Sequence, residues 1–190
     1  MEEILKQISE KHNCTYSQRK GTYDLSFNIR NLPMEIITLE QESTNFKLTA
    51  RCELLWGTSK TPSIWSGNTP DNNKFSIESH FKNNIEIPDF HIMEHDFIRK
   101  WIYGRDLKIK SKDKLFKDFL SNNNLIKGIY SSGKNSSELS PIIECYVKNT
   151  TPIIHINYQS FELNSDILDK SIEFCNQLMN YKTKHNIAYN

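Results

Sequence analysis

The sequence predicts an α+β protein in which antiparallel strands come first and helices enter later. Within residues 15–56, apolar and polar side chains alternate at 23–29 and at 46–56 with the period of two that a half-buried antiparallel strand requires. Residues 165–183 instead place apolar side chains at helical spacing. We therefore expect a strand meander in the first half, a mixed strand and helix second half, and a C-terminal helix packed on the sheet.

The first half should form three or four strands. The clearest one spans residues 46–56, with Phe46, Leu48, Ala50, Cys52, Leu54 and Trp56 on the buried side. Residues 23–29 alternate as well, residues 34–39 are predicted to form another strand, and Asn31-Leu32-Pro33 should separate the two because proline cannot donate a ladder hydrogen bond. A short amphipathic helix over residues 2–12 precedes this meander, and a strand over 75–81 follows it.

The second half is more mixed. Residues 90–104 are ambiguous, although Phe97, Ile98, Trp101 and Ile102 fit a helix ending at Gly104. The pattern then predicts a strand at 106–110, a helix capped by Ser111, and a second short helix over 125–130. A hairpin of residues 142–148 and 153–158 leads to the last helix. The chain is expected to be a single domain, 1–190, or two small halves, 1–104 and 105–190.

Composition excludes several classes of protein. The 190 residues include 24 Lys and Arg against 23 Asp and Glu, so bulk positive charge for nucleic-acid binding is absent. No apolar run approaches the length of about 18 residues that a membrane helix needs, and the start carries no signal-peptide pattern. We expect a cytoplasmic protein whose cysteines, including Cys52 and Cys145 on apolar strand faces, are reduced and buried.

Familiar catalytic and nucleotide-binding motifs are missing, so no cofactor is expected. His91 and His95 would lie one turn apart on a helix, a spacing that can bind zinc, and a metal-dependent hydrolase is one alternative function. Pro88-Asp89 suggests that the segment before His91 is irregular, which argues against the helix that such a site needs.

A basic segment gives a second alternative. Residues 97–134 carry 10 basic and 3 acidic side chains, whereas residues 35–96 carry 5 basic and 10 acidic ones. A strand would align Lys108, Lys110 and Lys112 on one face. A patch for a polyanion or nucleic acid within residues 99–117 would comprise Arg99, Lys100, Arg105, Lys108, Lys110 and Lys112. Alternatively, these lysines simply belong to the solvent-exposed face of a sheet and bind no ligand.

The long loop at 57–74 gives the favoured hypothesis. Trp56 and Trp65 flank a segment rich in glycine, proline and small polar residues, and Ile64 is its other large apolar side chain. Tryptophan is enriched at binding hot spots, and loops often carry function. The prediction is a non-catalytic protein that binds another macromolecule, most simply another protein, as an accessory, adaptor, inhibitor or immunity-type protein.

Overall fold

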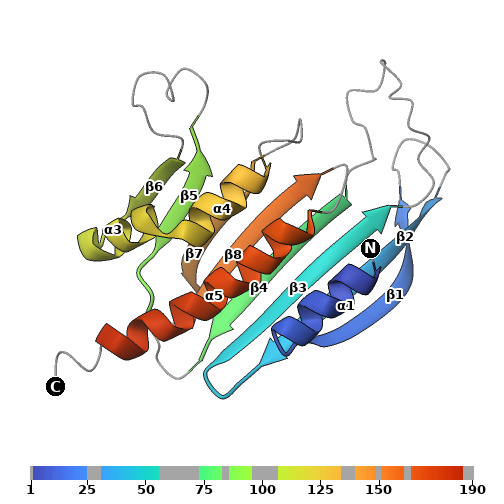
Figure 1. Cartoon of the computed structure of the whole chain (residues 1–190), viewed down its shortest axis with the longest axis horizontal. Coiled ribbons are helices and arrows are strands. Elements are labelled where there is room, and N and C mark those ends of the chain that lie inside the picture. The colour runs from blue at the N-terminus through green and yellow to red at the C-terminus, as the bar shows by residue number, and fades with distance from the viewer. Residues whose placement is uncertain are drawn as a thin grey trace.

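The computed structural model describes residues 2–24, 31–55, 73–82, 86–95, 107–133, 140–148, 151–160 and 164–185. Within them, eight antiparallel strands form one sheet in the order β1-β2-β3-β4-β8-β7-β5-β6 (Figure 1). The strands are β1 (Thr15–Asp24), β2 (Asn31–Glu42), β3 (Phe46–Leu55), β4 (Asn73–Phe81), β5 (Phe90–Glu94), β6 (Leu107–Ser111), β7 (Ile142–Lys148) and β8 (Thr151–Ser160). The predicted α+β class and the early meander are confirmed.

The sheet interleaves strands that are far apart in the sequence. β8 pairs with β4 on one side and with β7 on the other, and β5 lies between β7 and β6. β5 is a strand, which settles residues 90–94 of the segment that the sequence left ambiguous. Residues 96–106, where the alternative helix was expected, lie outside the described residues.

The predicted break before residue 34 is wrong, because β2 already begins at Asn31. Pro33 lies opposite Thr22 of β1, whereas the pairing of β2 with β3 begins only at Met34. Among the described residues, Pro33 is paired on the β1 side only, and a proline is tolerated where its nitrogen has no ladder acceptor opposite it.

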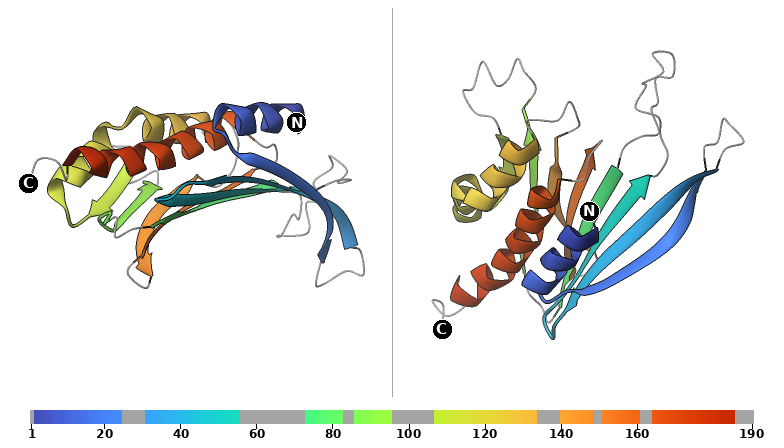
Figure 2. Two further views of the ribbon diagram at one scale, coloured as in Figure 1. Left: turned by 90° about the horizontal axis from the view of Figure 1, so that it is seen from below. Right: turned by 45° about the vertical axis from the view of Figure 1, so that its right-hand side comes forward.

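The helices of the described residues pack on one face of the sheet (Figure 2). They are α1 (Glu2–Lys11), α3 (Lys114–Asn122), α4 (Asn124–Gly133) and α5 (Ser165–His185). The first of them, the two short helices and the long C-terminal helix were all predicted. None of these described helices is long and apolar enough to cross a membrane.

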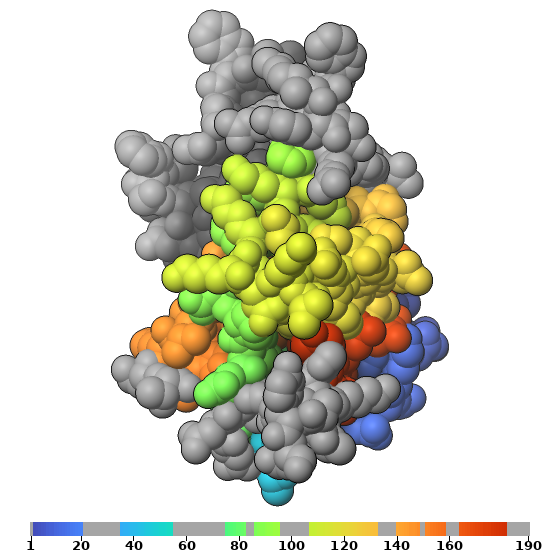
Figure 3. Space-filling view, turned by 90° about the vertical axis from the view of Figure 1, so that its left-hand side faces the viewer, coloured from blue at the N-terminus to red at the C-terminus, as the bar shows by residue number. Residues whose placement is uncertain are grey.

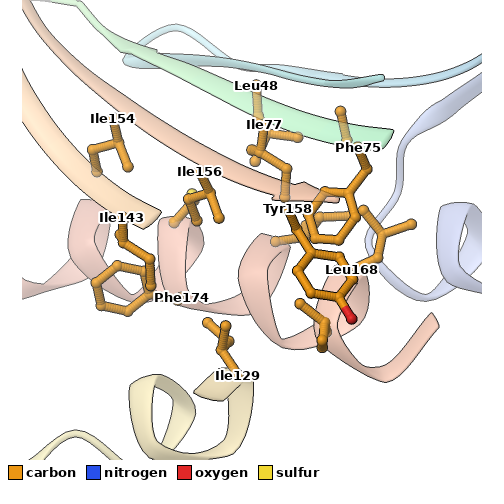
Figure 4. Close-up of a cluster of buried hydrophobic side chains, with 14 of the residues drawn as sticks. Leu48, Phe75, Ile77, Ile129, Ile143, Ile154, Ile156, Tyr158, Leu168 and Phe174 are labelled. Atoms are coloured by element: carbon orange, nitrogen blue, oxygen red, sulfur yellow. The ribbon is translucent and has the colours of Figure 1, made fainter. Parts of the chain in front are cut away.

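The core lies between the sheet and these helices. Inward side chains of β3, β4, β7 and β8 meet α4 and α5 there (Figure 4). Phe174 of α5 is fully buried and faces Ile143, and the centroid of its ring is 6.4 Å from the ring centroid of Phe90. The central strands therefore turn one set of alternate side chains toward the helices and the other set away from them. Ile36 of β2 and Ile153 of β8 belong to the second set and are nevertheless buried.

Asp113, and not Ser111, caps α3. The Asp113 carboxylate accepts a hydrogen bond from the backbone N–H of Phe116 at 2.8 Å, as an N-cap residue does. Ser111 still belongs to β6, so the strand runs further than predicted. Asn123 plays a similar role for α4, because its side-chain oxygen accepts from the backbone N–H of Leu125 at 2.9 Å.

Candidate functional site

The favoured contact loop falls outside the part of the chain that the structure describes. Trp56, Ile64 and Trp65 belong to residues 56–72, and β3 ends at Leu55. Their role in partner binding therefore stays a prediction. The same holds for Arg99, Lys100 and Arg105, since the described residues resume at Leu107.

The remaining lysines of the predicted basic patch are only partly aligned. Lys108 and Lys110 lie on β6 and share one face, because the alternate residues Leu107 and Ile109 pack against the core. Lys112 comes after the end of β6 and is exposed in the turn before α3. β6 and α3 form one end of the molecule, which faces the reader in Figure 3.

The helical spacing that would bring His91 and His95 together is not present. His91 lies in β5, and His95 directly follows that strand. In a strand, two side chains four residues apart are separated by about 13 Å along the chain, too far for one ion. In the described residues, no group of three or more His, Cys, Asp or Glu side chains could hold a metal ion.

The pairing register instead places His91 in a row of polar residues across the sheet. His91 lies opposite Lys110 of β6 and opposite Glu144 of β7. Glu144 lies opposite His155 of β8, and His155 lies opposite Glu78 of β4. We call the face that bears this row the open face, because it is turned away from the helices of the described residues (Figure 2).

Glu144 is the centre of this row. One carboxylate oxygen is 4.0 Å from Nδ1 of His91, and the other is 3.8 Å from Nδ1 of His155. Both separations exceed a normal hydrogen bond. Asn157 Nδ2 approaches Nδ1 of His155 to 3.1 Å, so the neutral ring can accept from that amide. Glu78 contacts His80 of its own strand.

Apolar side chains flank Glu144 on the same face. Ile142 and Tyr146 are each 41% exposed, and they alternate with the buried Ile143 and Cys145. Ile142, Glu144 and Tyr146 therefore point the same way from β7, and we call these three residues the β7 patch. The side chain of Glu144 is 36% exposed. The patch thus combines an aromatic ring, an aliphatic side chain and a carboxylate on a surface that ligands can reach.

The cysteines are poor nucleophiles. The structure leaves all four unpaired, and the predicted burial of Cys52 and Cys145 is confirmed. Burial raises the pKa of both thiols to about 12, and it raises the pKa of the half-buried Cys14 to about 11. Because the thiolate is the reactive form, these thiols are almost wholly unreactive near neutral pH.

Sequence reasoning missed the β7 patch, although one local signal was available. A two-residue connection between Lys148 and Thr151 fixes the hairpin register, and that register pairs Glu144 with His155. The neighbours contributed by β5 and β4 had no such signal.

Comparison of the chain with protein-family models, with curated proteins and with solved structures finds no match in any of the three.

Proposed function

We propose that this protein binds another protein, without catalysing a reaction, and that the β7 patch is a contact surface for it. The observation that supports this most is the exposure of Tyr146 and Ile142 side by side with Glu144. Aromatic residues are enriched in protein interfaces and tend to be their hot spots. An accessory protein, adaptor, inhibitor or immunity-type protein would each use such a surface.

A binding role also agrees with the chemistry of the described residues. Buried thiols with raised pKa values argue against a cysteine nucleophile. Unpaired cysteines are typical of a reducing compartment, which supports the cytoplasm as the place of action. His91 and His95 do not have the helical spacing on which the hydrolase alternative depended.

The open face favours a protein over a polyanion as the partner. Lys108 and Lys110 lie on the same face as Glu144 and Glu78. A phosphate chain laid along this row would meet the carboxylates of Glu144 and Glu78 and, further along on β2, that of Glu40, all of which repel it. A protein partner can place acidic groups near the lysines and basic groups near the glutamates.

The test compares two variants that each put a charge in place of an exposed apolar side chain. Tyr146→Asp alters the β7 patch, and Leu115→Asp alters α3, where Leu115 is 72% exposed. The immobilised wild type and both variants are incubated with extract of the native cell, and captured proteins are quantified by mass spectrometry. Circular dichroism checks that both variants are folded.

We expect a protein that the wild type and Leu115→Asp capture equally and that Tyr146→Asp loses. Repeating the measurement with that purified partner should give a loss for Tyr146→Ala of about 2 kcal/mol or more, which is about thirtyfold in Kd. Capture that survives Tyr146→Asp, or that both variants lose equally, would contradict the β7 patch as the contact surface.

A further inference from the structure

We infer that the β7 patch receives an arginine side chain of the partner, a conclusion that rests on the proposed function. The carboxylate of Glu144 accepts no hydrogen bond from any side chain or backbone group in the described residues, and neither Lys nor Arg pairs with it there. Its two histidine neighbours stand 3.8 and 4.0 Å away. With respect to the described residues, both of its oxygens are therefore available to a donor from outside.

The ring beside this carboxylate adds the second feature. Tyr146 follows Glu144 by two residues on the same strand and the same face, so the Cα atoms of the two residues are about 7 Å apart along the strand. A guanidinium can donate two parallel hydrogen bonds to a carboxylate while its flat surface packs on an aromatic ring. Ile142 lies on the other side of Glu144 and can contact apolar residues that flank the arginine.

The two other charges within the row that lie nearest to Glu144, those of Lys110 and Glu78, favour neither a cationic nor an anionic ligand. Lys110 lies beyond His91, two strands from Glu144, and Glu78 lies beyond His155, also two strands away. At about 10 Å each, these opposite charges act on a ligand at Glu144 with similar strength and largely offset one another. Selectivity for a cation therefore comes from the carboxylate of Glu144 itself. Selectivity for arginine over lysine comes from the forked donors of the guanidinium, which match a carboxylate, and from packing of the guanidinium on the ring of Tyr146.

Glu40 provides a matched control within the chain. It lies in the same register row, on β2, and it is an exposed glutamate that makes no ion pair in the described part of the chain. Its neighbours in the row are Thr15 and Thr49, so no aromatic ring lies beside it there. Glu40 thus offers the same charge without the flanking ring.

The experiment titrates isotope-labelled protein with a capped pentapeptide of sequence Gly-Leu-Arg-Leu-Gly and follows backbone amide shifts by NMR. We expect saturable shifts centred on residues 142–146 and 155. The same peptide with citrulline, which keeps the shape and removes the charge, should bind at least about tenfold more weakly, since charge-assisted hydrogen bonds are lost. Glu144→Gln should produce a similar loss, whereas Glu40→Gln should leave the affinity within about twofold.

Tyr146→Leu should weaken the arginine peptide about threefold and leave the lysine peptide less affected, as expected when a ring packs on the guanidinium. The inference would be overturned if the citrulline peptide bound as tightly as the arginine peptide, or if Glu144→Gln bound the arginine peptide as tightly as the wild type does. Shifts of similar size around Glu40 would also overturn it. If the capture of a partner depends on Tyr146 but the arginine peptide does not bind, the inference of a bound arginine is wrong, whereas the proposed function stands. If the peptide binds and no partner depends on Tyr146, the proposed function is the part that fails.

Discussion

Asp169 should hold the N-terminal helix on the rest of the protein. Its carboxylate on α5 accepts hydrogen bonds from Lys11 Nζ at 2.7 and 2.9 Å and lies 2.7 Å from Nε2 of His12, both at the end of α1. The His12 side chain is 7% exposed, whereas that of Lys11 is 55% exposed. The two contacts should therefore contribute differently to the free energy of unfolding.

The expected cost of Asp169→Ala follows from these two contacts. A buried hydrogen bond to a charged group contributes about 1.5–3 kcal/mol, because its loss leaves the His12 ring without a partner. An exposed ion pair such as that of Lys11 contributes about 0.2–1 kcal/mol. Asp169→Ala should therefore lower the free energy of unfolding by about 2–4 kcal/mol, and Lys11→Met by about 1 kcal/mol or less.

The effect should also depend on pH. Burial alone would raise the pKa of Asp169, but the hydrogen bonds from Lys11 and His12 outweigh it and hold this pKa below its ordinary value of 3.8. A carboxyl group whose pKa is lowered by folding stabilises the protein above its unfolded pKa, and this contribution is lost as the pH falls through the folded value. The difference between wild type and Asp169→Ala should therefore shrink below about pH 4.

Urea unfolding followed by circular dichroism at pH 7 and at pH 3 measures both effects, provided that the slope against urea stays the same. Equal losses for Asp169→Ala and Lys11→Met would refute the reasoning, because it assigns most of the free energy to the buried contact with His12. A difference that persists undiminished at pH 3 would refute the assigned direction of the pKa shift.

Three further predictions test the core, a helix cap and the loop. Phe174→Ala should cost about 3–5 kcal/mol of unfolding free energy in the same assay, since the ring is fully buried. Asp113→Ala should cost about 1 kcal/mol by loss of the α3 cap, and Asp113→Asn, which can still cap, clearly less. For Trp65→Ala we expect partner binding to weaken by about 2 kcal/mol or more with little change in the melting temperature. A stability loss of about 3–5 kcal/mol with unchanged partner affinity would instead mark Trp65 as core.

The fold was predictable where local pattern and tertiary environment agree. β3 alternates from Phe46 to Leu54 because one of its faces packs on the helices, and α5 shows an apolar seam because it lies on that face. The local rules failed where a long-range neighbour decides the outcome. Pro33 belongs to β2 and pairs with Thr22 of β1, and this pairing with a preceding strand is not contained in any local signal around Pro33.

The row on the open face was hidden for the same reason. The hairpin register alone could have placed His155 beside Glu144. The positions of His91 and Glu78 depend on the pairings of β5 with β7 and of β4 with β8, which join segments separated by dozens of residues. His91 therefore looked like a partner for His95, its neighbour in the sequence, and not for Glu144, its neighbour in space.

One further local signal distinguishes β7 from β3. The outward positions of β3 from residue 47 to residue 53 are polar, as a face in contact with water requires: Lys47, Thr49, Arg51 and Glu53. The outward positions of β7 include Ile142 and Tyr146, whose apolar surface gains nothing from water. Solubility alone would favour polar residues at both positions. An apolar side chain at such a position is not sufficient by itself, because Ile36 and Ile153 also lie at outward positions and are buried within the chain. The pair on β7 differs in that Ile142 and Tyr146 are exposed and lie together, which agrees with the proposed contact surface.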